Sequence, residues 1–276
     1  MSEVSFSKWQ GLGNDFVLCR AADMQSIDDL SKTARRWCDR HWGIGADGLI
    51  LAGPGKAGES QLTMEIYNAD GSAAAMCGNG IRCLAAWAAQ QGWVKDEGFA
   101  IGTRSGLKRV NVKKEAAGCW QVEVDMGEPR ILSSAQSGTV GGAEVTEYVV
   151  SMGNLHRVVL PDLAEGLGES WLQGLHADDT GRALENSAYG ECNVEFAVRK
   201  GCEELQMRVR ERGVGETMAC GTGACAVLTA ASLHGWCPRR ALIHLRGGDL
   251  AVRWEGDNRV MMRGPAVQVF EGTISL

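Results

Sequence analysis

The stretch MCGNGIRCLAAWAA at residues 76–89 has a counterpart in ACGTGACAVLTAA at residues 219–231. Each contains a Cys-Gly-x-Gly motif followed by a run that is apolar almost all round, whereas a surface helix would show a polar stripe. We therefore expect two buried helices, each wrapped by the strands of its own half of the chain. The glycines beside each cysteine leave the first amide N–H groups of the helix open to a ligand, and such a helix start attracts anions.

A second pair of landmarks recurs along the chain. The dipeptide Gly13-Asn14 returns 140 residues later as Gly153-Asn154, and Cys77 returns 143 residues later as Cys220. Two landmarks that keep nearly one offset indicate two related halves.

Many short runs have the alternation or β-branched content of strands. The predicted strands are residues 15–19, 48–52, 61–67, 109–113, 120–125, 147–152, 193–198, 204–210, 249–254, 258–263 and 267–270. Two further helices are expected within residues 27–41 and 163–175, and the Gly/Ser-rich residues 133–145 are interpreted as the connection between the halves. The pattern predicts a strand-dominated α+β fold.

Composition narrows the functional class. A chain of 276 residues with 45% hydrophobic content favours two domains of ordinary size. The net charge of -6, with no basic run beyond short pairs such as Arg239-Arg240, gives no footprint for nucleic acid or an anionic membrane. No apolar run reaches the roughly 20 residues of a membrane span, and the N-terminus does not resemble a secretion signal. We expect a cytoplasmic protein with a small or proteinaceous partner.

The ten cysteines do not predict a disulfide framework, because thiols stay reduced in the cytosol. The sequence holds no Cys-x-x-Cys, and the half-site of Cys38 and His41 has no second half, so no metal site is expected. Cys19, Cys119 and Cys192 are interpreted as small buried hydrophobes. Cys77 and Cys220 differ, because a helix N-terminus lowers the pKa of a thiol and each could then act as a base.

Five blocks together resemble the diaminopimelate epimerase family almost end to end: residues 8–17 (KWQGLGNDFV), 41–49 (HWGIGADGL), 68–83 (NADGSAAAMCGNGIRC), 152–156 (MGNLH) and 211–226 (ERGVGETMACGTGACA). The resemblance implies two similar domains, each a strand barrel around a central helix, with the active site in the cleft between them. The expected domains are residues 1–124 plus 266–276, carrying Cys77, and residues 125–265, carrying Cys220. It also implies that no cofactor and no metal are needed.

The family's chemistry gives a reason for two thiols. Inverting a carbon by proton transfer requires removal of hydrogen from one face and delivery to the other, and a thiolate and a thiol can exchange these roles. The resemblance assigns Cys77 and Cys220 as this catalytic pair, and His156 and Glu211 as thiol-activating or orienting residues. It assigns substrate binding to Asn14, Asn68, Gly78, Asn79, Asn154, Asn193, Glu211, Arg212, Gly221 and Thr222.

Two positions depart from the family pattern. Leu155 stands where the family usually has proline, which would relax the turn that presents His156, and Trp9-Gln10 replaces Met-His, which would alter the cleft wall. Residues 43–48 fit the dinucleotide fingerprint G-x-G-x-x-G, but there a helix-like run precedes and a strand-like run follows. The order is reversed, so nucleotide binding is not expected.

The predicted function is interconversion of LL- and meso-diaminopimelate, a step toward lysine and peptidoglycan precursors, by an isomerase whose partner is a small amino acid. One alternative is a racemase of another amino acid on the same scaffold. A second is a catalytically silent amino-acid-binding module, and a third is a thiol-disulfide redox protein, which the missing Cys-x-x-Cys disfavours. Homodimer formation stays open.

Overall fold

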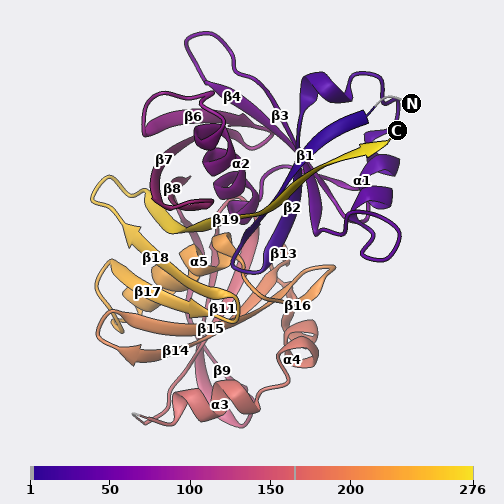
Figure 1. The fold of residues 1–276 in the computed structure, drawn as a ribbon. Helices are drawn as coiled ribbons and strands as arrows, with labels where there is room; N and C mark the ends of the chain where they lie inside the picture. Colours follow the sequence, from indigo (N-terminus) through magenta and orange to yellow (C-terminus); the bar gives the residue numbers. More distant parts are fainter. Residues whose placement is uncertain (1–2, 165, 276) are drawn as a thin grey trace. The chain divides into compact units, whose positions relative to one another are not determined.

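The computed structural model describes residues 3–164 and 166–275. The chain divides into two compact units, Met1–Val124 with Gly264–Leu276, and Asp125–Arg263. In each unit one long buried helix is surrounded by strands, with shorter helices outside them (Figure 1). Across the described residues no helix is both long and apolar enough to cross a membrane.

Unit 1 is built around helix α2. Its helices are η1 (Ala21–Met24), α1 (Leu30–Cys38) and α2 (Gly78–Gln90). Its strands are β1 (Glu3–Gly11), β2 (Asn14–Arg20), β3 (Gly48–Pro54), β4 (Leu62–Asn68), β5 (Ala73–Ala74), β6 (Gly98–Thr103), β7 (Gly106–Ala116), β8 (Cys119–Gly127) and the later part of β19 (Val260–Ser275). The pairs β2–β3 and β4–β6 are parallel, whereas β1–β2, β1–β19, β3–β4 and β6–β7–β8 are antiparallel.

Strand β2 separates two apolar layers because successive side chains point to opposite faces. Val17 and Cys19 belong to an outer cluster that includes Trp37 of α1. The inner layer approaches the start of α2, where a Cβ added to Gly80 would lie 2.9 Å from Ile50 Cδ1. Burial on both faces explains why the four consecutive residues 16–19 of β2 are all apolar.

Unit 2 is built around helix α5. Its helices are α3 (Gly168–Gly174), α4 (Ala177–Leu184) and α5 (Gly221–Leu233). Its strands are β9 (Arg130–Val140), β10 (Ala143–Ser151), β11 (Leu155–Pro161), β12 (Asn186–Ser187), β13 (Gly190–Glu191), β14 (Asn193–Gly201), β15 (Glu204–Glu211), β16 (Gly215–Thr217), β17 (Arg240–Leu245) and β18 (Gly248–Trp254). The pairs β11–β14 and β15–β17 are parallel, and β9–β10–β11, β14–β15–β16 and β17–β18 are antiparallel.

The strand register places three buried polar residues of unit 2 on one face of the sheet. His156 of β11 stands opposite Asn193 of β14, and Glu195 of β14 stands opposite Val209 of β15. Because side chains alternate along a strand, His156, Asn193 and Glu195 point to the same side of the sheet. Val194 and Phe196 of β14 point to the other side, into the cluster formed with Leu172, Leu175 and Ala177 of α3, α4 and their connection.

The predicted α+β class and the two buried helices are confirmed. All residues of α2 from Gly78 to Ala88 are buried, and α5 is buried through Ala231 except for the half-exposed Thr222. The reversed order around residues 43–48 is also observed, since α1 precedes and β3 follows.

The interpretation of residues 133–145 as a connection between halves is wrong. These residues form the hairpin of β9 and β10, in which Val140 pairs with Ala143 across Gly141 and Gly142. Both glycines have positive φ, 58° and 77°, as a two-residue hairpin turn with strand-matching twist requires. The Gly/Ser content reflects an exposed strand face, and the border between the units falls within β8 instead.

Several boundaries also differ from the sequence prediction. The first helix covers only Leu30–Cys38, because the Asp29 side chain caps it by accepting from the Lys32 amide. The helix expected in residues 163–175 is observed as Gly168–Gly174. Residue 165 of that range lies outside the described residues. Helix α4 was not predicted. The last two predicted strands are one strand, β19. The strands β1, β6, β9, β11 and β17 were missed, as were the short strands β5, β12, β13 and β16.

Candidate functional site

Both long helices begin at a cysteine that serves as their N-cap. The sulfur of Cys77 accepts a hydrogen bond from the Gly80 amide at 3.5 Å, and the sulfur of Cys220 accepts from the Gly223 amide at 3.4 Å. In both cases the cysteine backbone is extended and the helix starts at the next glycine. The thiols therefore stand where a serine or aspartate would normally cap a helix, at the positive end of the helix dipole.

In each unit the asparagine of the Gly-Asn landmark contacts the second residue after the cysteine. In unit 1, Asn79 Nδ2 donates to Asn14 Oδ1 at 3.2 Å. In unit 2, Asn154 Nδ2 donates to Thr222 Oγ1 at 3.3 Å. The preceding glycines have φ of 80° and 102°, a left-handed conformation that favours glycine. The near-equal offsets in the sequence thus correspond to the same local arrangement in each unit.

The Asn14 amide is oriented by a carboxylate. Asn14 Nδ2 donates to Asp47 Oδ2 at 2.7 Å, which turns Asn14 Oδ1 toward the Cys77 thiol, 3.8 Å away. Asp47 is held in turn by Arg40 at 2.9 Å. Asp47 belongs to residues 41–49, one of the blocks that resemble the family. This block therefore contributes the carboxylate that orients Asn14.

A neighbouring ion pair supports the same turn. The Lys8 ammonium lies 2.8 Å from Asp15, which also binds Arg40 at 2.8 Å. Burial raises the pKa of Asp15, but the hydrogen bonds and charges of Arg40 and Lys8 outweigh it and hold that pKa below its ordinary value. The Lys8 side chain is only 6% exposed and also donates to the Gly45 carbonyl, so this pair fixes the strand that carries Asn14.

The second thiol lies in a more enclosed setting. Cys220 is 5% exposed, with Thr222 Oγ1 at 3.4 Å and Asn193 Nδ2 at 3.9 Å from its sulfur. Burial, and then the negative charges of Glu211 and Glu195, raise the pKa of Cys220 well above its ordinary value, although Thr222 and the Gly223 amide oppose this. For Cys220 the expectation that the helix start lowers the thiol pKa is wrong, because burial and two carboxylates outweigh the Gly223 amide and the Thr222 hydroxyl.

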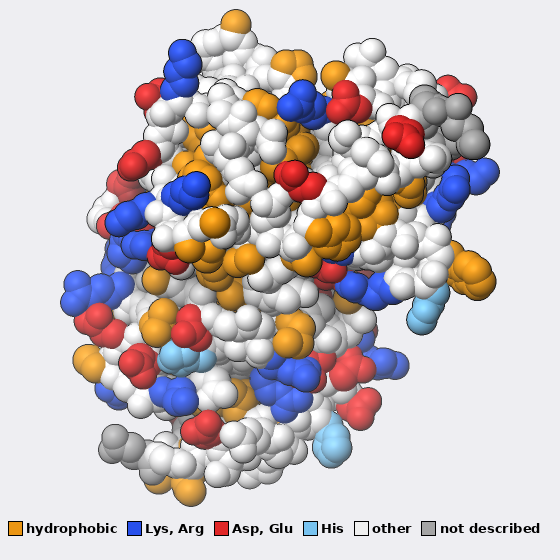
Figure 2. All heavy atoms as spheres, in the orientation of Figure 1, with side chains coloured by type: hydrophobic (Ala, Val, Ile, Leu, Met, Phe, Trp, Pro, Cys, Tyr) orange, Lys and Arg blue, Asp and Glu red, His pale blue; other side chains and the backbone are white. Residues whose placement is uncertain are grey.

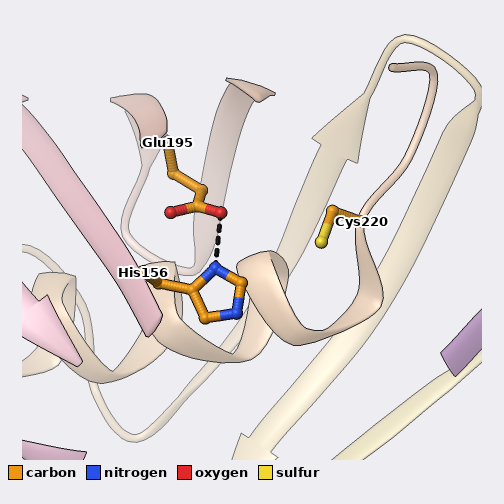
Figure 3. Close-up of side chains that lie close together, drawn as sticks. All are labelled: His156, Glu195 and Cys220. Atoms are coloured by element: carbon orange, nitrogen blue, oxygen red, sulfur yellow. Dashed lines mark hydrogen bonds and ion pairs between the residues drawn. The ribbon is translucent and has the colours of Figure 1, made fainter. Parts of the chain in front are cut away.

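His156 and Glu195 form a buried pair beside this thiol. His156 Nδ1 and Glu195 Oε1 are 2.6 Å apart, and both side chains are 0% exposed. Figure 3 shows the imidazole ring below the Glu195 carboxylate, with the Cys220 thiol to one side of both. Reactive atoms of the three residues all lie within 4.8 Å of one another. Sequence reasoning missed Glu195, although a single glutamate within the otherwise apolar run NVEFAV is a signal for a buried, paired carboxylate.

The residue types of this cluster are also those that bind zinc. A zinc ion would lie about 2 Å from each ligand atom. The facing atoms of His156 and Glu195 are 2.6 Å apart, which is closer than two atoms that are each bound about 2 Å from one tetrahedral zinc ion. The geometry fits a hydrogen-bonded pair beside a thiol.

The remaining predicted residues are distributed around these two groups. Glu211 Oε1 accepts from Thr217 at 2.6 Å, and the Arg212 amide donates to Asn193 Oδ1 at 2.9 Å while the Arg212 side chain is exposed. Asn68, exposed at the end of β4, donates to Ser72 at 2.9 Å rather than to the Cys77 group.

The two departures from the family pattern lie in different settings. Trp9 is 0% exposed and donates to Ser7 at 2.8 Å, and an effect of Trp9-Gln10 on a cleft wall stays a prediction. Gln10 accepts from the Gly13 amide at 3.0 Å and so supports the turn before Asn14. Leu155 begins β11.

The other cysteines are mostly buried. Seven of the ten cysteines are buried, among them Cys19 and Cys192 as predicted, whereas Cys119 is only partly buried. Burial raises the pKa of Cys83, on the same helix as Cys77, to about 12, and it does the same for Cys19. Such thiols are protonated and unreactive at neutral pH.

Comparison with known proteins agrees with this picture. Residues 6–132 and 148–269 match the family model described as "Diaminopimelate epimerase". Proteins of that name from Synechocystis sp. and Moorella thermoacetica are 40% and 41% identical to this chain, over 98% of it and 98% and 99% of their own lengths. A solved structure of a Bacillus anthracis phenazine biosynthesis protein aligns with a TM-score of 0.73 over 100% of both chains. At 11% identity that likeness concerns the fold alone.

Proposed function

This chain belongs to the diaminopimelate epimerase family, and we propose that it interconverts LL-2,6-diaminopimelate and meso-diaminopimelate by a two-thiol, cofactor-independent reaction. The observation that carries the mechanism is the matched pair of helix starts, each capped by its own cysteine sulfur. Cys83 and Cys225 lie within the same two helices but face the packed core, so only one thiol of each helix is placed at its start.

Two thiols solve the stereochemical problem of the reaction. In each direction one thiolate removes the α-hydrogen from one face, while the other group, as a thiol, delivers a proton to the opposite face. A single base would tend to return its own proton to the same face. Cys77 and Cys220 are assigned these roles, and each ends the turnover in the other's starting protonation state.

The helix starts supply the stabilisation that a pyridoxal cofactor would otherwise provide. Removal of the α-hydrogen moves negative charge onto the substrate carboxylate. Amide N–H groups of a first helical turn and the positive end of the helix dipole favour such charge, most strongly where water is excluded. We assign this role to the amides of Gly78, Asn79, Gly221 and Thr222.

The distal amino-acid end of the substrate needs its own partners. The exposed guanidinium of Arg212 suits a bidentate contact with a carboxylate. Glu211 suits an ammonium group and also lies close enough to affect the Cys220 thiol. The side-chain amides assigned to this end are Asn14, Asn68, Asn154 and Asn193, of which Asn14 and Asn193 also contact the thiols.

Substitution of the thiols tests the reaction. Cys77→Ala and Cys220→Ala should each reduce formation of meso-diaminopimelate from the LL isomer by at least about 10³-fold, the scale of a lost acid–base group. Cys83→Ala is the matched control, since it removes a thiol from α2 that is buried in the core, and it should retain activity. Substantial epimerisation by either of the first two variants would contradict the two-thiol assignment.

The substrate is tested separately. Incubation with LL-diaminopimelate in deuterated water, beside a panel of basic and cyclic amino acids, should give α-deuterium only in diaminopimelate. Exchange in another amino acid would point to a racemase on the same scaffold. Binding without any exchange would point to a silent amino-acid-binding module.

We further infer that the enzyme acts in the cytoplasm, where thiols are kept reduced, and that its partner is a small amino acid. Basic and acidic side chains are interspersed on the face drawn in Figure 2, without a single-sign tract that would attract nucleic acid or a lipid surface.

A further inference from the structure

Glu195 is a buried carboxylate that the family resemblance did not assign to the site. It lies on the inner face of β14, and its Oε1 atom is 2.6 Å from His156 Nδ1. The start of α5 is shaped around it, because a Cβ added to Gly223 would lie 2.6 Å from the same Oε1 atom. The third residue after Cys220 must therefore be glycine for the thiol, the helix start and this carboxylate to lie so close together.

We propose that Glu195 is a positioning residue that orients His156 to receive the proton of the Cys220 thiol, an inference that rests on the proposed two-thiol function. The chemical step is a proton transfer within the protein. The S–H bond of Cys220 breaks, an N–H bond forms at His156 Nε2, and the negative charge stays on sulfur. His156 keeps that proton while Cys220 and Cys77 exchange the substrate hydrogen, so the two sulfurs together always carry one negative charge.

The hydrogen bond decides which ring nitrogen can accept that proton. In a neutral imidazole one nitrogen carries hydrogen and the other a lone pair. When Nδ1–H donates to the Glu195 carboxylate, the lone pair is on Nε2. Within the described part of the chain Nε2 is fully buried and makes no hydrogen bond, so it is free to act as an acceptor. The ring itself lies beside Cys220 (Figure 3).

The surroundings of Cys220 explain why an acceptor is needed. Burial disfavours a thiolate, and so do the two carboxylates that face the sulfur, Glu211 from β15 and Glu195 from β14. The Gly223 amide and the Thr222 hydroxyl favour the thiolate but do not outweigh them. An imidazolium at His156 would supply the missing positive charge, and Glu195 would stabilise that imidazolium at a site without solvent.

Glu195 therefore has two opposite effects on Cys220. Its field acts directly against the thiolate. Its hydrogen bond to His156 acts for the thiolate, by stabilising the protonated ring. Removal of the Glu195 charge therefore distinguishes the two effects. If only the direct field matters, Cys220 should become more reactive. If the hydrogen bond to His156 matters more, Cys220 should become less reactive.

The experiment measures the alkylation of Cys220 by iodoacetamide as a function of pH, resolved by peptide mass spectrometry in the full-length protein. Alkylation does not require turnover, so its rate tests the role of Glu195 even if the proposed epimerase reaction is wrong. Glu195→Gln should slow alkylation at pH 7 by about tenfold or more, equivalent to at least one pH unit in the thiol titration. Unchanged or faster alkylation would overturn the proposal.

Steady-state kinetics give the second readout. Glu195→Gln should lower kcat on the order of 10²-fold or more with little change in KM, since a wrongly held imidazole loses acid–base catalysis. In a His156→Asn background the same substitution should lower kcat no further. An equal loss in both backgrounds would show that Glu195 acts on the fold and not through His156.

Two further variants guard against a trivial loss of folding. Glu147→Gln is the matched control, because Glu147 is also a buried carboxylate of unit 2 but binds Arg157, at 2.6 Å. It should leave Cys220 alkylation unchanged. Glu195→Asp keeps the charge but shortens the reach, so the relay predicts a rate between wild type and Glu195→Gln. Wild-type alkylation and kcat in Glu195→Asp would contradict a role that depends on position.

Discussion

The duplicated glycines Gly80 and Gly223 offer a sharp comparison, because the same substitution should have different consequences in the two units. Each lies three residues after a cysteine and donates its amide to that sulfur, which an alanine would still do. At Gly80 an added Cβ meets the mobile ends of side chains, the nearest at 2.9 Å. At Gly223 it meets Glu195 Oε1 at 2.6 Å, together with two other Glu195 carbons at 3.2 Å.

Glu195 cannot move away from such a methyl group without cost. To reach an ordinary contact of 3.4 Å from its present 2.6 Å, the carboxylate oxygen must shift by about 0.8 Å, and the same oxygen binds His156. Displacements of about 1 Å in a catalytic array can lower rates on the order of 10²-fold. Overpacking costs about 1–3 kcal/mol, against about 1 kcal/mol gained from helix propensity, so Gly223→Ala should lose about 0–2 kcal/mol of stability.

The assay compares kcat, KM and thermal unfolding of Gly223→Ala and Gly80→Ala. We expect Gly223→Ala to fold with kcat reduced by about tenfold to 10²-fold and KM little changed. Gly80→Ala should keep kcat within about threefold, because side-chain ends can adjust. Wild-type kcat in Gly223→Ala would refute the reasoning. Equal losses in both would indicate that flexibility of the helix starts, and not the Glu195 contact, is what matters.

Three other predictions concern the supporting residues and the thiols. Asp15→Asn should lower the free energy of unfolding by about 3 kcal/mol at pH 7, because the buried Lys8 ammonium loses its carboxylate. The pKa of Asp15 is lowered in the folded protein, so the greater stability of the wild type is present above pH ~4. In denaturation curves this difference should shrink as the pH falls below that value. Asp47→Ala removes the acceptor that orients the amide beside Cys77, and should lower kcat/KM about tenfold or more without loss of folding. Mild oxidants should inactivate the enzyme reversibly if Cys77 and Cys220 meet at one substrate, with a Cys77–Cys220 peptide seen by mass spectrometry; full activity after oxidation would count against their proximity.

The features that repeat along the chain were the ones that sequence could predict. The two helices and their capping cysteines follow from local patterns that need no knowledge of distant contacts, namely an apolar run and a preceding Cys-Gly-x-Gly. The Gly13-Asn14 and Gly153-Asn154 landmarks were recognisable because each needs a left-handed glycine, which few other residues tolerate.

What sequence missed depends on partners far along the chain. Glu195 was overlooked because its meaning comes from a hydrogen bond to His156, 39 residues away, across a parallel strand pair. The thiol environment of Cys220 was misjudged for the same reason, since the helix start is local but the burial and the carboxylates are not. The hairpin of β9 and β10 was mistaken for a linker because serine and glycine on an exposed strand face look like a flexible segment.

The two-thiol claim is tested most directly by the position of isotope at early conversion. In deuterated water with the LL isomer as substrate, two bases predict deuterium at the inverted carbon of the meso product and hydrogen retained in the recovered LL substrate, because the thiol that removed the hydrogen can return only that hydrogen. Substrate hydrogen carried over into the meso product, or equal deuterium in product and recovered substrate from the first turnovers, would mean that one base serves both faces, and the paired roles of Cys77 and Cys220 would be wrong.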